Sequence, residues 1–268
     1  MRWNTGGVNY CYLLSSQDKL NSWLIDPAES DEVIPNLTSS ERQSIKAIVN
    51  THHHYDHSDG NMSMINELKQ EGKRFVVKIV AGSKSSPDAT ELPEHLQHYK
   101  LGNLDITCIR TPCHTVDSIC YHVKDPETNE QCIFTGDTLF IGGCGRFFEG
   151  NGVQMDEALN ERIIHGVGEP NWNLTRVYPG HEYTKSNVKF IREYVYQELG
   201  ENEALDNLEK YADKHEMTCG EFTIDDELKY NPFMRLDDPL VRKAVGDDDS
   251  SWKRSKVMET LRKLKNSM

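Results

Sequence analysis

The heptapeptide Thr-His-His-His-Tyr-Asp-His occupies residues 51–57 and directly follows the apolar segment Ala47–Val49. Neutral imidazole and carboxylate groups are ligands that Zn²⁺ and similar divalent ions accept. Burying so many ionisable groups together without an ion would be costly. The alternative is a solvated His-rich loop, but the interleaved Asp56 and the preceding strand are not typical of a low-complexity tract. The segment therefore predicts a metal site at the end of a strand.

Composition limits the class of protein. A chain of 268 residues, 37% hydrophobic and 27% charged, can hold one large domain, or a medium domain with a smaller appendage. It contains no apolar stretch of about 18 residues, so we expect no transmembrane helix and no membrane partner. Residues 1–7 show neither a secretory nor a transit pattern, which favours a cytoplasmic location. The net charge of −13 disfavours nucleic acid as a partner.

The seven cysteines are scattered along the chain, and no Cys-x-x-Cys pair occurs among them. An odd number of cysteines in strand-like apolar runs is typical of reduced thiols that pack as small hydrophobic side chains. This pattern also agrees with a cytoplasmic protein.

Hydrophobic periodicity predicts a mixed α/β region followed by a helical region. We expect strands at residues 10–14, 22–26, 47–50, 75–80, 105–109, 119–123, 132–135 and 176–178. We expect helices at residues 61–69, 155–165, 187–199, 202–215, 225–228, 239–245 and 253–265. The change in pattern near residue 184 predicts a catalytic domain at residues 1–182 and a helical domain at residues 183–268.

Three further polar residues follow predicted strands. His114 lies in Thr-Pro-Cys-His-Thr, Asp137 in Thr-Gly-Asp-Thr, and His181 in Pro-Gly-His-Glu. Each alone would more often be a loop or capping residue. Together with the histidine-rich segment they suggest one site, because sites in α/β proteins collect at strand ends. A Cys113–His114 nucleophilic pair is disfavoured because adjacent residues rarely face each other.

These motifs, in this order, resemble those of the metallo-β-lactamase superfamily, and more closely those of glyoxalase II, the hydroxyacylglutathione hydrolases. The resemblance extends through Gly143–Gly150 and Asn231–Arg235, so it covers nearly the whole chain. It implies an αββα sandwich with a C-terminal all-helical domain.

The resemblance also implies a site for two divalent metal ions, with zinc preferred and iron or manganese acceptable. One ion would be held by His52, His54 and His114, the other by Asp56, His57 and His181, with Asp137 bridging. Asp56 and Asp137 would be the catalytic carboxylates. His53 should point away, since alternate residues of an extended segment face opposite sides.

The activity implied is hydrolysis of S-D-lactoylglutathione to D-lactate and glutathione, the second step of methylglyoxal detoxification, by a hydroxide shared between the ions. The family's glutathione contacts correspond to Arg146, Tyr183, Arg262 and Lys265. Without the resemblance, Arg262 and Lys265 would be read as an ordinary basic helix face. Phe148 replaces a tyrosine found in many members, and losing one hydrogen bond should weaken glutathione binding by about 0.5–1.5 kcal/mol.

Other functions remain open at this point. A mononuclear-iron persulfide dioxygenase of the same superfamily is disfavoured by the basic residues of the helical region. A metal-binding relative without catalysis would lack a ligand, and none is missing. A β-lactamase or a tRNA-processing enzyme is disfavoured by the remaining sequence, the latter by its acidic balance. We expect a monomer whose partner is a small glutathione thioester.

Overall fold

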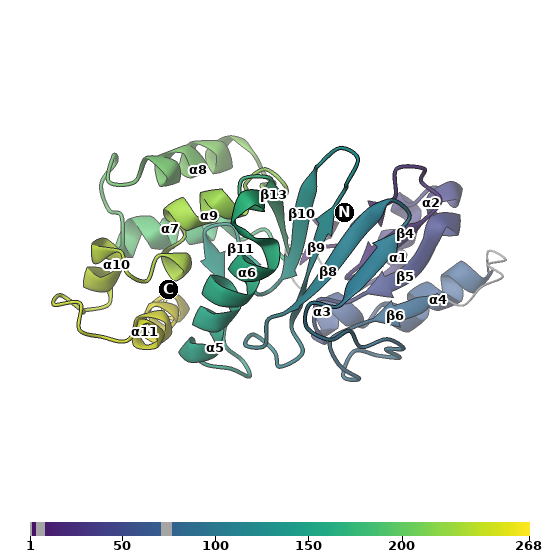
Figure 1. The fold of residues 1–268 in the computed structure, drawn as a ribbon, viewed down its shortest axis with the longest axis horizontal. Coiled ribbons are helices and arrows are strands. Elements are labelled where there is room, and N and C mark those ends of the chain that lie inside the picture. Colours follow the sequence, from purple (N-terminus) through teal and green to yellow (C-terminus); the bar gives the residue numbers. More distant parts are fainter. Residues whose placement is uncertain (1, 4–8, 71–76) are drawn as a thin grey trace.

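The computed structural model describes residues 2–3, 9–70 and 77–268 (Figure 1). The strands are β1 (Arg2–Trp3), β2 (Asn9–Tyr10), β3 (Tyr12–Ser15), β4 (Ser22–Ile25), β5 (Ile45–Val49), β6 (Lys78–Val80), β7 (His98–Leu101), β8 (Leu104–Arg110), β9 (Ile119–Lys124), β10 (Gln131–Gly136), β11 (Leu139–Phe140), β12 (Gly143–Cys144) and β13 (Thr175–Pro179). The α-helices are α1 (Ser30–Val33), α2 (Ser39–Ser44), α3 (Tyr55–Ser58), α4 (Asn61–Gln70), α5 (Gly152–Glu157), α6 (Ile164–Val167), α7 (Thr184–Tyr194), α8 (Glu203–Lys214), α9 (Ile224–Tyr230), α10 (Pro239–Ala244) and α11 (Arg254–Asn266). A π-helical segment (Ala158–Ile163) joins α5 to α6.

Two sheets form the centre of the fold. One has the strand order β3-β4-β5-β6 and the other the order β13-β10-β9-β8-β7. Strands β4, β5 and β6 are parallel, as are β10 and β13, whereas β8 to β10 pair in antiparallel fashion. The carboxyl ends of β4 and β5 therefore share one edge of the first sheet. The carboxyl ends of β8, β10 and β13 share one edge of the second.

Three apolar layers hold the sheets and helices together. The first lies between the sheets and joins residues such as Trp23 and Val49 to Tyr121 and Phe134. The second packs helices α1 and α4 against the outer face of the first sheet. The third packs α5, α6 and the C-terminal helices against the second sheet, as the helices on either side of the sandwich in Figure 1 illustrate. This arrangement confirms the predicted αββα sandwich with a C-terminal helical domain.

The predicted elements recur with local differences. The strand expected at residues 10–14 is interrupted at Cys11, and residues 75–76 of another lie outside the described residues. Strand β7 was not predicted because most of its side chains are polar and solvent-facing, as on an exposed edge strand. All seven cysteines are free thiols. Among the helices in the described part of the chain, none has the length and apolar character needed to span a bilayer.

Helix α11 is fixed to the α/β part of the chain near the start of α5. The guanidinium of Arg254 donates to the carboxylate of Asp156 at 3.0 Å. The carboxylate of Glu259 accepts a hydrogen bond from the backbone N–H of Gly152 at 2.8 Å. A Cβ atom on Gly152 would lie only 2.4 Å from the carbonyl oxygen of Ser255, so the two helices approach closely. These contacts set the position of the basic residues further along α11.

A buried carboxyl group connects α9 to the β11–β12 hairpin. Glu227 accepts hydrogen bonds from the backbone N–H of Gly142 at 3.0 Å and from the side-chain amide of Asn231 at 2.8 Å. The hydroxyl of Tyr230 also donates to it at 2.6 Å. Burial raises the pKa of Glu227 from its ordinary 4.5 to about 8, despite these donors.

This pKa predicts that stability falls with rising pH. Because folded Glu227 binds its proton more tightly than the unfolded chain does, its contribution is complete below pH 4.5 and is lost as pH rises through 8. The slope between these values should approach about 1.4 kcal/mol per pH unit. We expect Glu227→Gln, which stays neutral, to lose less stability than wild type between pH 5 and 8 in urea denaturation. Glu161→Gln, an exposed control, should keep the wild-type slope; an unchanged slope in Glu227→Gln would contradict the prediction.

Candidate active site

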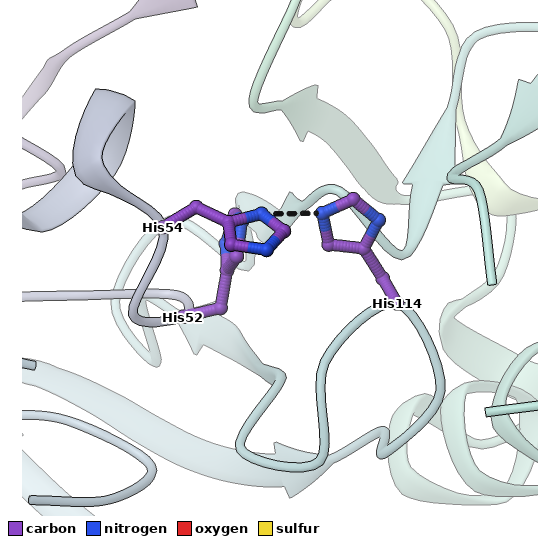
Figure 2. A group of neighbouring side chains, drawn as sticks. All are labelled: His52, His54 and His114. Carbon is purple, nitrogen blue, oxygen red and sulfur yellow. Dashed lines mark hydrogen bonds between the residues drawn. The ribbon is translucent and has the colours of Figure 1, made fainter. Parts of the chain in front are cut away.

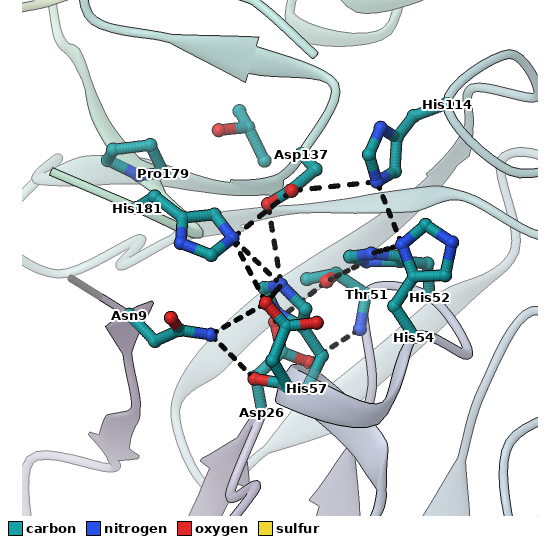
Figure 3. A network of polar contacts seen from close by, with 12 residues as sticks. Asn9, Asp26, Thr51, His52, His54, His57, His114, Asp137, Pro179 and His181 are labelled. Carbon is teal, nitrogen blue, oxygen red and sulfur yellow. Dashed lines mark hydrogen bonds and ion pairs between the residues drawn. The ribbon is translucent and has the colours of Figure 1, made fainter. Parts of the chain in front are cut away.

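The predicted donor residues meet at the carboxyl ends of the strands (Figure 3). The segment after β5 carries the histidine-rich motif, and the loop after β8 carries His114. Asp137 directly follows β10, and His181 follows β13 by one glycine. Segments far apart in the sequence thus place their side chains in one small volume, because their strands end at facing edges of the two sheets.

A first group of donors consists of His52, His54 and His114 (Figure 2). The Nδ1 atom of His54 lies 3.1 Å from Nε2 of His52 and 3.1 Å from Nε2 of His114. His52 and His114 are buried, whereas His54 is half-buried at the edge of the site. Burial is the main factor that lowers the pKa of all three imidazoles, so they remain neutral, as metal ligands must be.

A second group consists of Asp56, His57 and His181. The Nε2 atoms of the two histidines are 3.3 Å apart. The Oδ2 atom of Asp56 lies 3.7 Å from Nε2 of His57 and 3.5 Å from Nε2 of His181. Helix α3 begins at Tyr55, and its single turn places the side chains of Asp56 and His57 close to His181.

Asp137 lies between the two groups. Its Oδ2 atom is 3.5 Å from Nε2 of His114 and 3.2 Å from Nε2 of His181, and its Oδ1 atom is 3.5 Å from Nε2 of His57. Burial acts to raise the pKa of Asp137, but the neighbouring histidines outweigh it and hold the pKa well below the ordinary value. The group is therefore a carboxylate that contacts donors from both sides.

Two glycines allow the loops to approach Asp137. A Cβ atom on Gly180 would lie 2.3 Å from Oδ1 of Asp137 and 2.9 Å from Cε1 of His57. A Cβ atom on Gly145 would lie 1.9 Å from the carbonyl oxygen of Asp137. Any larger residue at either position would displace a donor, which explains the glycine of the Pro-Gly-His segment in physical terms.

Three contacts orient the donors from outside, and the sequence did not reveal them. The carboxylate of Asp26, at the end of β4, accepts from Nδ1 of His57 at 3.0 Å. The side-chain amide of Asn9 donates to Oδ2 of Asp56 at 3.0 Å. The Nδ1 atom of His114 donates to the carbonyl oxygen of Arg146 at 2.9 Å. Such partners fix ring orientation and tautomer in metal sites.

The spacing and charge of the donor set fit bound metal ions. Ligand atoms around one tetrahedral ion at 2.0–2.1 Å are separated by roughly 3.3 Å. In the first group the donor atom of His54 lies 3.1 Å from those of His52 and His114, and in the second group the donor atoms lie 3.3–3.7 Å apart. Oδ1 of Asp137 and Nδ1 of His181 are buried without a hydrogen-bond partner in the described residues. The carboxylates of Asp26, Asp56 and Asp137 lie in this one site, so their negative charge must be balanced by positive charge.

The pKa of His57 shows the same requirement. Burial acts to lower this pKa, but the charges of Asp137, Asp26 and Asp56 outweigh it and raise the pKa to about 9. In the absence of an ion, a proton on His57 balances part of the carboxylate charge. The donor set is thus built around a cation, and the superfamily's metal site fits the residues present.

The fourth histidine of the motif, His53, lies outside both donor groups. Its Nδ1 atom is 2.8 Å from Oδ1 of Asp117, and its side chain is 24% exposed. We expect His53 to point away from the metal ions, and its contact with Asp117 is consistent with that expectation.

A cavity of about 800 Å³ connects the donor groups to the C-terminal helices. All five residues predicted to bind substrate line it, namely Arg146, Phe148, Tyr183, Arg262 and Lys265. Sequence reasoning missed Tyr55 and Lys189, which also line it. Within the described chain, the only acidic side chains in the lining are Asp56 and Asp137, whereas four lysine and arginine side chains line the cavity. This local charge is opposite in sign to the net charge of the chain.

Helix α11 and the hairpin hold the basic residues in place. Nη1 of Arg262 donates to the carbonyl oxygen of Cys144 at 2.8 Å, and this side chain is only 7% exposed. Nζ of Lys265 donates to the carbonyl oxygen of Ser186 at 2.7 Å. Burial lowers the pKa of Lys265 to about 8, so an anionic ligand would favour its charged form.

Two aromatic rings lie against the donor groups. Phe148 is 60% exposed, and its ring centroid is 5.4 Å from that of His54 and 5.2 Å from that of His114. Tyr183 stacks on His181 at 4.8 Å. Burial, and then the charges of nearby aspartates, raise the pKa of Tyr183 to about 12, so its phenol remains a hydrogen-bond donor.

Comparison with models of known protein families shows the superfamily to which the chain belongs. Residues 4–166 match the model of the metallo-β-lactamase superfamily, in agreement with the sandwich and its strand-end donors. Residues 182–268 match the model described as the hydroxyacylglutathione hydrolase C-terminus.

Full-length relatives specify the family. A hydroxyacylglutathione hydrolase of Saccharomyces cerevisiae, named as mitochondrial, is 63% identical over 100% of this chain and 94% of its own length. A cytoplasmic isozyme from the same organism is 60% identical over 100% of this chain and 97% of its own length. The chain therefore belongs to the hydroxyacylglutathione hydrolases, the glyoxalase II family.

Solved structures support the fold alone. ETHE1 from Myxococcus xanthus matches with a TM-score of 0.57 at 21% identity, over 97% of this chain and 95% of its own. A metallo-β-lactamase from Staphylococcus aureus matches with a TM-score of 0.57 at 18% identity, over 95% of this chain and 68% of its own.

The contact between Asp26 and His57 yields a prediction about metal affinity. We expect Asp26→Asn to weaken metal binding by about 10–100-fold, since the anionic partner of a ligand histidine is lost. Asparagine tolerates the positive φ of 51° at this position, so the backbone should remain in place. Competition with a chelating indicator measures the affinity. Asp105→Asn, on the exposed side of β8, serves as the control, and equal affinities in the two variants would contradict the assignment.

Proposed function

We propose that this chain hydrolyses S-D-lactoylglutathione to D-lactate and glutathione. The observation that carries the proposal is the single cavity that joins a metal-binding donor set to a cationic wall, in a chain 60–63% identical to hydroxyacylglutathione hydrolases over its full length. A glutathione thioester carries carboxylates that the cationic wall can bind and a carbonyl that the donor end can receive.

The proposed metal content is two divalent ions per chain, most simply Zn²⁺, with iron or manganese as alternatives that the same ligands accept. His52, His54 and His114 would hold one ion, Asp56, His57 and His181 the other, and Asp137 both. Bound there, the ions would supply a nucleophile by lowering the pKa of water and would polarise the thioester carbonyl. Asp56 and Asp137 are the carboxylates nearest this chemistry.

The chain's own residues orient the substrate. Arg262 and Lys265 would bind glutathione carboxylates, and Arg146 lines the same cavity from the segment after β12. The phenol of Tyr183 would donate a hydrogen bond close to the donor groups. Phe148 has no such donor and would instead contact the substrate through its ring. A thiol has an ordinary pKa near 8.5, so the glutathione thiolate can leave without strong acid assistance.

The alternative functions have less support. The relatives of 60–63% identity are not persulfide dioxygenases by name, and no predicted ligand is missing, as a non-catalytic relative would require.

We retain residues 1–182 and 183–268 as the proposed domains, and a monomer without nucleic-acid partners as the proposed assembly. Relatives bear both mitochondrial and cytoplasmic names, so the proposed cytoplasmic location is to be tested by cell fractionation.

Replacing Asp137 tests the catalytic assignment. We expect wild-type protein to hydrolyse S-D-lactoylglutathione and Asp137→Ala to lose nearly all activity and part of its metal, because this carboxylate contacts donors of both groups. Loss of thioester absorbance gives the rate, and elemental analysis gives the ions per chain. His165→Ala, an exposed histidine outside the site, should match wild type. Full activity of Asp137→Ala would refute the bridging role, and an inactive wild type would refute the function.

Replacing the basic residues of α11 tests substrate binding. We expect Lys265→Ala and Arg262→Lys to raise KM with little change in kcat. For Lys265→Ala the rise in KM should be about tenfold, because a charged hydrogen bond to the substrate is lost. Lys263→Ala is a matched control on the same helix, because Lys263 is 72% exposed and pairs only with Glu259 among the described residues. A pure kcat effect of Lys265→Ala would contradict its role in binding.

A further inference from the structure

His53 contacts two carboxylates that come from two different loops. Its Nδ1 atom lies 2.8 Å from Oδ1 of Asp117, and its Nε2 atom lies 3.8 Å from Oε1 of Glu149. Asp117 belongs to the loop that carries His114, and Glu149 to segment 145–150. His53 therefore connects the metal motif with both loops that surround the donor groups.

Asp117 forms the fixed end of this connection. It is 1% exposed and accepts hydrogen bonds from the hydroxyl of Thr115 at 2.7 Å and from the hydroxyl of Ser83 at 2.8 Å. With three donors around one buried carboxylate, the orientation of the His53 ring is determined. Its second nitrogen consequently faces Glu149.

Glu149 forms the other end and holds the two loops together. Its Oε2 atom accepts a hydrogen bond from the backbone N–H of Val116 at 2.6 Å. The carbonyl oxygen of Arg146 accepts from His114, and a Cβ atom on Gly150 would lie 2.7 Å from the Cα atom of Cys113. Segment 145–150 is thus bonded to the His114 loop at Arg146 and at Glu149, and its end at Gly150 approaches that loop closely.

Phe148 depends on these attachments. Its ring packs edge-on against His54 and His114, yet 60% of the residue is exposed. A side chain so little buried receives only weak positioning from apolar contacts. Its place beside the donor groups must therefore come from the backbone, which Glu149 fixes one residue further along.

We propose that His53, Asp117 and Glu149 form a clasp that holds segment 145–150 beside the donor groups and so places Phe148 against the bound acyl-glutathione. His53 and Glu149 are then positioning residues that act on substrate binding through Phe148. This inference rests on the proposed thioesterase function. It assigns to His53 a role that is separate from metal ligation.

Glu149→Ala tests the clasp in three measurements. We expect KM for S-D-lactoylglutathione and the Kd of S-methylglutathione in calorimetry to rise by about fivefold, in the range of one lost hydrogen bond, with kcat nearly unchanged. The Val116 amide should exchange hydrogen faster, in the metal-free protein as well. Metal content should equal that of wild type. Glu149→Gln keeps an acceptor for the Val116 amide and should restore most of the affinity.

Double substitution separates the clasp from a general structural effect. Phe148→Ala should raise KM by a similar factor, and Phe148→Ala/Glu149→Ala should raise it no further, because both act through the same ring. His53→Gln should raise KM in the same way with full metal content. Glu127→Ala removes an equal charge from the exposed β9–β10 turn and should leave KM unchanged.

The outcomes distinguish this inference from the proposed function. An active wild type with an unchanged KM in Glu149→Ala would overturn the clasp and leave the function intact. Additive effects of Phe148→Ala and Glu149→Ala would overturn it equally, because Glu149 would then act by another route. A wild-type protein that binds S-methylglutathione but does not hydrolyse the thioester would refute the function, while the binding and exchange measurements would still test the clasp.

Discussion

The carboxylate of Asp137 lies within 3.5 Å of imidazole nitrogens from both donor groups, in a position that is 9% exposed. A carboxylate so far from solvent is stable only when positive charge surrounds it. The surrounding loops supply histidines for this purpose. The ring nitrogens of these histidines lie close together and face one another. The remaining architecture can be understood as the means of holding these groups together until an ion binds.

The sandwich achieves this through strand direction. Strands that run in the same sense end at the same edge, so each loop needs only one to four residues to bring its first donor to the site. Glycines at 145 and 180 remove the steric obstacle to close approach. The helical extension then adds Lys189, Arg262 and Lys265 to the cavity that Arg146 of the sandwich also lines, so cations gather beside the donor groups. A protein with a net charge of −13 thereby carries a group of cations in its cavity, which suits the anionic substrate that we propose.

The donor residues could be predicted because each follows an apolar strand in the sequence, and residue type, order and strand ends are all visible there. The residues that orient them could not be predicted in this way. Asp26 ends a strand but has no distinguishing motif, and its role depends on the pairing of β4 with β5. Glu149 appears as one more surface acid until the fold brings it beside Val116 and His53. Edge strand β7 was missed for the opposite reason, since its polar pattern suggests a loop.

The placement of every donor loop at one end of the sheets leaves the other end without a part in catalysis. The turns at residues 16–21, 102–103 and 125–130 lie there, and the first two are joined by a hydrogen bond from the backbone N–H of Gln17 to the side chain of Asn103. This end could accept an inserted epitope, a fluorophore or a surface tether. An immobilised molecule attached through it would keep the cavity mouth open to solution, with no linker crossing the substrate's path.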